Sequence, residues 1–166
     1  MTRRQLLRTQ QAGNFPNRST GVWAQGYRVG DTVFLQGQAG LTLDGELVGP
    51  GDPALQTRQA IANIETLLAL AGGTLADVVK IVVYVTDYAY RPLVYPIISE
   101  LFPDPKPCST GLVVSGLALP ELTVEIDAWA VVESGKELER LLGTIVRAIS
   151  GAWSRRPTVC VPSLHT

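Results

Sequence analysis

The chain has few of the residues that build metal centres, redox sites and disulfide frameworks. Its 166 residues include two cysteines, one histidine and one methionine. The cysteines, Cys108 and Cys160, are too few for a framework, and His165 lies in an aperiodic C-terminal segment. No Cys/His cluster has metal-ligand spacing. We therefore expect no bound metal and, in the absence of a signal peptide, a reducing cytoplasmic location.

A strong charge of one sign and a long apolar run are also missing. The net charge is −1, which argues against a nucleic-acid partner, and the basic residues near both ends are typical of solvated tails. No apolar run reaches the roughly 18 residues that a membrane helix needs. The glycines at 49–51 lack the Lys and Ser/Thr of a phosphate loop, and the serine-containing string at 114–116 lacks the flanking glycine pattern of a nucleophile elbow. Phosphoryl transfer and serine hydrolysis therefore lose support.

Hydrophobic periodicity predicts one α+β domain after a polar, poorly ordered lead-in over residues 1–19. The predicted strands are 22–29, 32–39, 78–85, 109–117 and 122–132, and the predicted helices are 53–71, 87–102 and 136–149. The order ββαβαββ favours a mixed sheet with two helices on one face, plus an extra C-terminal helix. The other sheet face must be buried in another way, and oligomerisation is the simplest.

An acidic pair lies on the last predicted strand. Glu125 and Asp127 are two residues apart, so both carboxylates point to one face of the sheet. A carboxylate on an otherwise apolar strand is costly unless it is paired or used. Glu125 is therefore the leading functional candidate: it holds a water or a substrate N–H, or it forms an ion pair across a subunit boundary.

Three segments resemble the Rid family, the reactive intermediate deaminases of the YjgF superfamily. They are GDTVFLQGQAG at 30–40, TRQAIANIETLLALAGGTLADVVKIVVYVTD at 57–87 and LALPELTVEIDAWA at 117–130. The resemblance covers residues 20–133 and leaves 134–166 as a separate segment. It implies a chorismate-mutase-like fold, a homotrimer with ligand sites between subunits, no cofactor, and hydrolysis of small imines or enamines. An imine carbon is already electrophilic, so such a site needs only to hold the substrate and position a water.

The resemblance also carries site residues onto this chain. The water-positioning glutamate of the family matches Glu125. The family's arginine, which pairs with the substrate carboxylate, aligns with Ser109, or with Cys108 if the alignment gap is placed differently. Neither side chain carries the positive charge of an arginine. The family's tyrosine, serine and asparagine fall on Trp23, Gln36 and Tyr95. The substrate implied is larger and less anionic than 2-aminoacrylate.

Each of these substituted positions has a plainer interpretation. Cys108 is a nucleophile or a small buried residue, and without a nearby base the second is favoured. Thr110 and the serine before it donate hydrogen bonds to a ligand or simply begin a strand. Trp23 and Tyr95 form an aromatic pocket wall or pack in a core or interface. Arg91 pairs with the substrate carboxylate in place of the missing family arginine, or it is simply exposed to solvent.

Two functions from different classes therefore remain open. The first is a divergent Rid-like enzyme that acts on an imine, enamine or related carbonyl compound through Glu125. The second is a non-catalytic trimer that captures a small metabolite or docks a partner protein. The amphipathic helix expected at 136–149 docks such a partner or, as the favoured interpretation, covers an exposed sheet edge. RNA cleavage has less support, because the slightly acidic chain has no basic stripe.

Overall fold

The computed structural model describes residues 4–9 and 23–133. Contacts divide the chain into two units, Met1–Val132 and Glu133–Thr166. The helix expected at 136–149, like the rest of 134–166, lies outside the described residues, so the C-terminal part of the domain division stays a prediction. Within the described ranges, no helix is long and apolar enough to cross a membrane.

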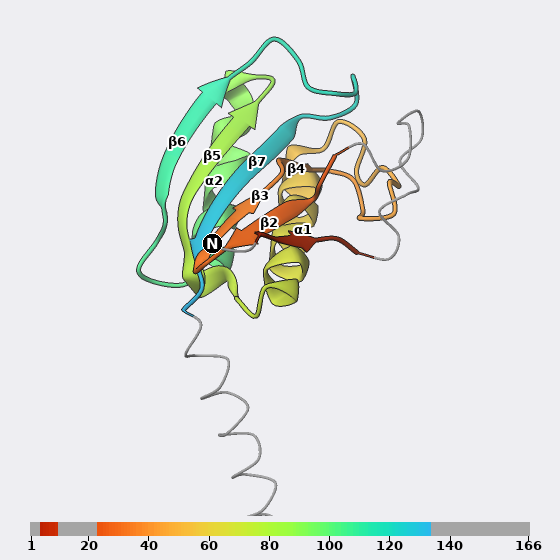
Figure 1. Cartoon of the computed structure of the whole chain (residues 1–166). Coiled ribbons are helices and arrows are strands. Elements are labelled where there is room, and N and C mark those ends of the chain that lie inside the picture. Colours follow the sequence, from red (N-terminus) through yellow and green to blue (C-terminus); the bar gives the residue numbers. More distant parts are fainter. Residues whose placement is uncertain (1–3, 10–22, 134–166) are drawn as a thin grey trace, which may run out of the picture. The chain divides into compact units, whose positions relative to one another are not determined.

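A seven-stranded mixed sheet forms the centre of the first unit (Figure 1). Its strands are β1 Arg4–Leu7, β2 Gly26–Val29, β3 Thr32–Leu35, β4 Gln38–Ala39, β5 Val78–Val85, β6 Cys108–Val113 and β7 Val124–Val131. The order is β1-β2-β3-β7-β5-β6, with β4 also paired to β7. β5 and β6 are parallel and the other pairs are antiparallel. The last strand therefore lies in the middle of the sheet.

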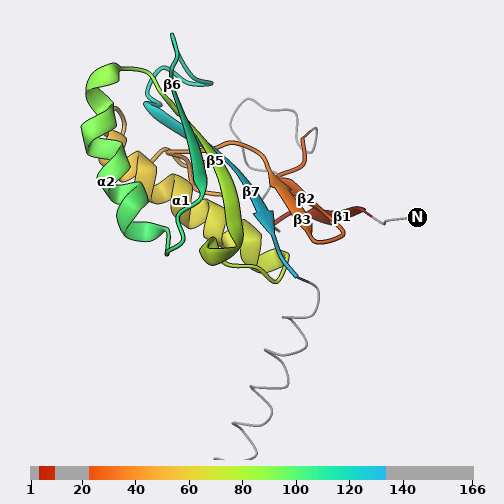
Figure 2. The same ribbon diagram turned by 90° about the vertical axis from the view of Figure 1, so that its left-hand side faces the viewer.

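Two helices cover one face of this sheet. They are α1, Pro53–Leu70, and α2, Arg91–Leu101, which is preceded by the 3-10 turn η2, Tyr88–Tyr90; a second 3-10 turn, η1, is Leu75–Asp77. Figure 2 shows both α-helices on the same side of the strands. The side chain of Asp52 accepts hydrogen bonds from the amides of Ala54 and Leu55, as its N-cap position predicts. The predicted α+β fold with two helices on one face is confirmed.

Alternation along β7 separates the two faces. Its helix-facing side chains are fully buried: Val124, Ile126, Ala128 and Ala130. The side chains of Glu125 and Asp127 point to the opposite face, as predicted from their spacing. That opposite face, which we call the open face, leaves Tyr27 and Phe34 exposed in the described chain.

The structure corrects three predicted elements. Residues 4–7 are not part of a lead-in: they form β1, which pairs with β2 and buries Leu7. The strand expected over 32–39 is interrupted at Gln36 and Gly37, after which β4 pairs with β7. The strand expected over 109–117 ends at Val113. β1 depends on tertiary pairing, because its backbone partners lie in β2.

Candidate active site

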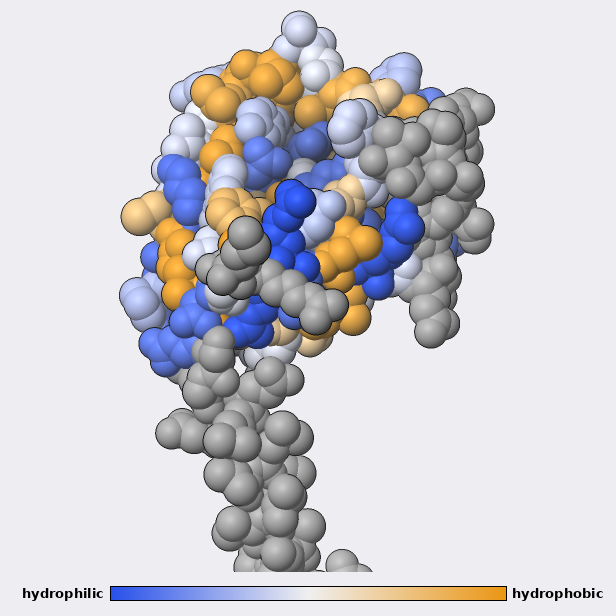
Figure 3. Space-filling model, in the orientation of Figure 1, coloured by the Kyte–Doolittle hydropathy of each residue, from blue (hydrophilic) through white to orange (hydrophobic). Residues whose placement is uncertain are grey.

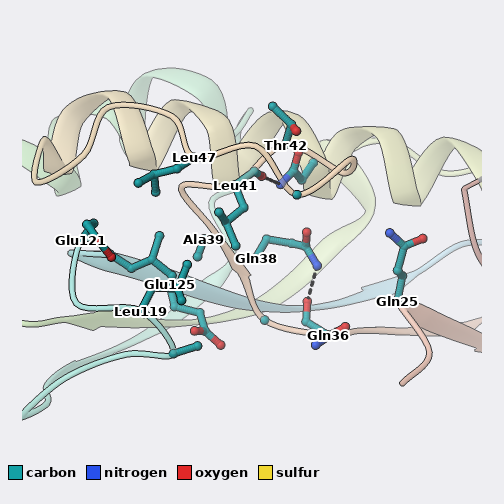
Figure 4. A pocket seen from close by; sticks show the side chains of 15 residues that line it. Gln25, Gln36, Gln38, Ala39, Leu41, Thr42, Leu47, Leu119, Glu121 and Glu125 are labelled. Carbon is teal, nitrogen blue, oxygen red and sulfur yellow. Dashed lines mark hydrogen bonds between the residues drawn. The ribbon is translucent and has the colours of Figure 1, made fainter. Parts of the chain in front are cut away.

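A pocket of about 410 Å³ lies beside β4, between α1 and the segment that leads into β7. Its lining residues are Gln25, Gln36, Gly37, Gln38, Ala39, Leu41, Thr42, Gly45, Leu47, Asn63, Ala118, Leu119, Glu121, Leu122 and Glu125. Figure 4 shows Glu121, Leu119 and Glu125 together at one end, Gln36 and Gln38 in the middle, and Gln25 at the other end. The pocket is thus built from segments that are far apart in the sequence.

Buried amides on α1 fix two walls of this pocket. The side chain of Asn63 donates to the carbonyl of Leu41 at 2.7 Å and so holds the adjacent loop. Gln56, which is fully buried, donates to the carbonyl of Glu121 at 2.8 Å and accepts from the amide of Thr123 at 2.7 Å. The chain entering β7 is therefore held rigidly just before it reaches Glu125, which favours a fixed position for that carboxylate.

Gly37 makes room for the two carboxylates of β7. A Cβ atom at this position would lie against Oε1 of Glu125 and 2.8 Å from Oδ1 of Asp127. The other oxygen of Asp127 accepts a hydrogen bond of 2.8 Å from the hydroxyl of Tyr84. That hydrogen bond, together with burial and the negative charges of Asp127 and Glu125, raises the pKa of Tyr84 above its usual 10.0. Tyr84 thus stays a protonated donor at neutral pH.

The pocket is acidic and rich in amides. Among the described residues that line it, Glu121 and Glu125 carry negative charge and none is a lysine, arginine or histidine. Four carboxamides add donors and acceptors, and one of them, Gln38, donates to the carbonyl of Gln36 at 2.8 Å. No group of three or more His, Cys, Asp or Glu that could hold a metal occurs in the part of the chain that the structure describes. The arrangement can polarise a water through a carboxylate and accept hydrogen bonds from a ligand nitrogen.

The predicted site residues fall into separate places within the described chain. Glu125 and Gln36 line the pocket together. Trp23 is 69% exposed and is not among the lining residues. Cys108 and Thr110 are exposed on the edge strand β6, where Thr110 accepts a hydrogen bond from Lys80. Their assignment as substrate-binding residues stays a prediction.

Ser109 and Tyr95 lie near the helical layer, on the other side of β6. Ser109 shares a face of this strand with Gly111, two residues later. A Cβ atom at Gly111 would meet the hydroxyl of Tyr95 and, at 2.7 Å, Nη1 of Arg91. The guanidinium of Arg91 in turn stacks 4.8 Å from the centre of the Tyr95 ring. Tyr95 therefore packs against Arg91 and β6, and it does not line the pocket of its own chain.

Sequence reasoning missed most of the amides of the site. Gln25 is buried, and its side-chain oxygen accepts from the amide of Thr9 at 2.8 Å. Asn63 was visible only as part of the helix that resembles the family, and Glu121 as part of a turn. A polar residue on the buried stripe of a helix is the signal that would have found Asn63, because such a residue needs a partner in the core.

A family model described as endoribonuclease L-PSP matches residues 15–132. The chain belongs to this family. The match spans β2 to β7, both α-helices and every residue that lines the pocket, and leaves out β1. It confirms the predicted membership of the Rid, or YjgF, superfamily.

Relatives and solved structures agree with this assignment. A RutC family protein of Pyrococcus abyssi is 35% identical over 114 residues, 68% of this chain and 88% of that protein. A protein of Dermatophagoides farinae named 2-iminobutanoate/2-iminopropanoate deaminase is 27% identical over 113 residues, 68% of this chain and 88% of its own length. A Mycobacterium tuberculosis member of the YjgF/YER057c/UK114 family is 32% identical, with a TM-score of 0.66 over 78% of this chain and 100% of that one. The predicted chorismate-mutase-like fold is thus shared with solved structures.

Proposed function

We propose that this chain is a homotrimeric enzyme that hydrolyses a small imine or enamine to a carbonyl compound and ammonia, with Glu125 as general base. The observation that carries the proposal is the carboxylate of Glu125 in the wall of a 410 Å³ pocket. A relative 27% identical to this chain is named as a deaminase of two imino acids, which supports the same class of reaction.

Glu125 has the chemistry that the reaction needs. A water attacks the carbon of the protonated imine, the C–O bond forms, and the π electrons of the C=N bond move to nitrogen while Glu125 takes a proton from the water. The protonated Glu125 then returns this proton to the nitrogen of the carbinolamine. The C–N bond breaks, the hydroxyl oxygen forms the carbonyl, and its proton leaves on ammonia as ammonium. An enamine enters the same sequence after it tautomerises to the imine.

A trimer accounts for the open face of the sheet. Exposed apolar side chains lie there on β1, β2, β3 and β7 and on the edge strand β6; they include Leu6, Tyr27, Phe34, Val131 and Leu112. Figure 3 displays this face, with apolar and polar groups interspersed. An apolar surface of this kind is typical of an interface between chains. The cytoplasmic location stays a prediction.

RNA cleavage, which the description of the family as an endoribonuclease suggests, has less support. The described lining of the pocket has two carboxylates and no cation, so a phosphodiester would enter against like charge. The C=N group of an imine, which is neutral or positively charged, meets no such barrier.

The proposal is tested by imine hydrolysis. An L-amino-acid oxidase generates imines from Leu, Met, Phe and Trp in situ, and semicarbazide traps whatever imine survives. We expect the protein to lower the semicarbazone signal and Glu125→Gln, which keeps the shape and removes the base, to lower kcat by at least about 100-fold. Glu65→Gln, an exposed change on α1, is the matched control.

No turnover of any imine by a folded trimer would contradict the proposal. The alternative would then be the non-catalytic trimer that binds a small metabolite in the same pocket, which equilibrium binding measurements on the same preparation would detect.

A further inference from the structure

The charge of the pocket restricts the substrate further than the reaction class does. Glu121 and Glu125 lie at one end, and no lysine, arginine or histidine is among the described lining residues. The carboxylate of Glu121 forms no ion pair within the described chain, and its main chain is held by Gln56. A ligand carboxylate would enter against these two charges, whereas a cation would be attracted.

The rest of the lining suits a small cation with an apolar tail. Leu41, Leu47, Leu119 and Leu122 supply apolar surface for an alkyl or aryl group. The amide of Gln38, fixed by its donation to the Gln36 carbonyl, leaves a carbonyl oxygen that can accept a hydrogen bond from a ligand N–H. Acceptors and acids at the polar end, with leucines beside them, match a protonated C=N group that carries a hydrocarbon substituent.

We infer that the preferred substrate is the protonated imine of an amine, R–CH=NH₂⁺, and not an imino acid with a carboxylate beside the C=N bond. This inference rests on the proposed function and names its substrate class. The reaction is R–CH=NH₂⁺ plus water giving R–CHO plus NH₄⁺, so the C–O bond forms, the C–N bond breaks, and the charge leaves on ammonium. A reaction that oxidises an amine must supply such an imine.

Arg91 is the cation that the sequence offered as a partner for the carboxylate of the rival substrate class. Its guanidinium lies 5.9 Å and 4.8 Å from the centres of the Tyr88 and Tyr95 rings, beside β6 and not in the pocket lining. If a neighbouring subunit brought its own Arg91 to the pocket, imino acids would bind there and their binding would depend on that residue. The substitution Arg91→Gln therefore separates the two substrate classes.

The turnover test compares two imines that differ only in the carboxylate. A flavin-dependent amine oxidase makes the imine from 2-phenylethylamine, and an L-amino-acid oxidase makes it from phenylalanine. Semicarbazide trapping then measures the protein-catalysed rate above the uncatalysed rate for each. We expect kcat/KM to be at least about tenfold higher for the amine-derived imine. An equal or higher value for the imino acid would overturn the inference.

Two substitutions that each remove one negative charge test whether the preference for a cationic substrate depends on Glu121. Glu121→Gln is expected to raise KM for the amine-derived imine by about three- to tenfold with a small change in kcat, because it removes attraction and leaves Glu125 in place. Glu65→Gln, on the exposed surface of α1, is expected to change neither constant. Equal effects of the two substitutions would contradict a local role for Glu121.

A binding measurement separates this inference from the proposed function. Isothermal titration with 2-phenylethylammonium and with phenylacetate compares a cation and an anion on the same hydrocarbon. Tighter binding of the ammonium by about tenfold or more, with no turnover of any imine, would support the preference of the pocket for a cation over a carboxylate and would contradict the proposed function. Turnover together with tighter binding of phenylacetate that Arg91→Gln abolishes would overturn the inference and leave the proposed function standing. If neither ligand binds, the inference fails.

Discussion

Gly37 is the residue on which the geometry of the proposed general base depends. Its missing side chain leaves the space that the carboxylates of Glu125 and Asp127 occupy. We expect Gly37→Ala to displace the carboxylate of Glu125 and to lower kcat/KM by about 10- to 100-fold, because a misplacement of about 1 Å is enough for such a loss. The measurement is the semicarbazone assay on purified protein.

Gly116→Ala is the control for this substitution. A Cβ atom at Gly116 would have no neighbour within 4 Å, so the same added methyl group should leave both activity and stability unchanged. Full activity of Gly37→Ala would mean that the Glu125 carboxylate can take another position without loss, and would count against its role as a fixed base.

Tyr84 gives the stability of the fold a dependence on pH. The pKa of Tyr84 is raised above 10.0, chiefly because only the protonated hydroxyl can donate to Asp127. Because the pKa of Tyr84 is higher in the folded than in the unfolded state, the protonated hydroxyl stabilises the folded state fully below the unfolded pKa of about 10. This stabilisation disappears as the pH rises through the folded-state pKa. Tyr84→Phe removes it. The difference in unfolding free energy between wild type and variant should therefore shrink above about pH 10 in urea titrations, whereas a constant difference would contradict the role.

At the scale of elements, Gln56 connects α1 to the chain that enters β7. Its side chain donates to the carbonyls of Gly49 and Glu121 and accepts from the amide and hydroxyl of Thr123, with all four distances between 2.7 and 2.9 Å. Gln56→Leu leaves these buried groups without partners. We expect a loss of about 2–4 kcal/mol in the free energy of unfolding, measured by urea titration.

The control for Gln56 is the same substitution at an exposed position, Gln5→Leu in β1. Its expected effect is below about 0.5 kcal/mol. Equal losses from the two substitutions would show that the buried amide contributes no more than a surface one.

Element-level prediction from the sequence succeeded where the signal is local. The N-cap at Asp52 and the alternation of Glu125 and Asp127 follow from neighbouring residues, and both are confirmed. β1 was missed because residues 4–7 have too little alternation to identify a strand, which is stabilised by its pairing with β2. The interruption at Gln36 was missed for a similar reason, since it depends on β7.

The pocket could not be predicted because it belongs to the whole molecule. Gln25, Asn63 and Glu121 line one pocket in a fold whose last strand, β7, lies between β3 and β5 in the sheet. Long-range pairing of this kind leaves no local pattern in the sequence. The family resemblance did supply Glu125 and Gln36, which line the pocket together, but the buried amides around them became visible only with the fold.

At the same scale, the open face of the sheet should hold the proposed trimer together. Phe34 on β3 is 45% exposed, and its partners in the neighbouring strands are Tyr27 and Trp129. Phe34→Glu places a charge in the centre of this apolar row, where burial in an interface would require its desolvation. We expect the trimer to dissociate, as measured by light scattering coupled to size-exclusion chromatography.

Leu70→Glu is the matched control, because Leu70 is 43% exposed on α1, away from the open face. It should leave the trimer intact. If the ligand sites lie between subunits, Phe34→Glu should also lose turnover at low protein concentration and regain it as concentration rises, because mass action restores the assembly. A monomeric Phe34→Glu variant that keeps full activity would mean that the pocket of one chain is sufficient for turnover. A Phe34→Glu variant that remains trimeric would mean that another surface holds the subunits together.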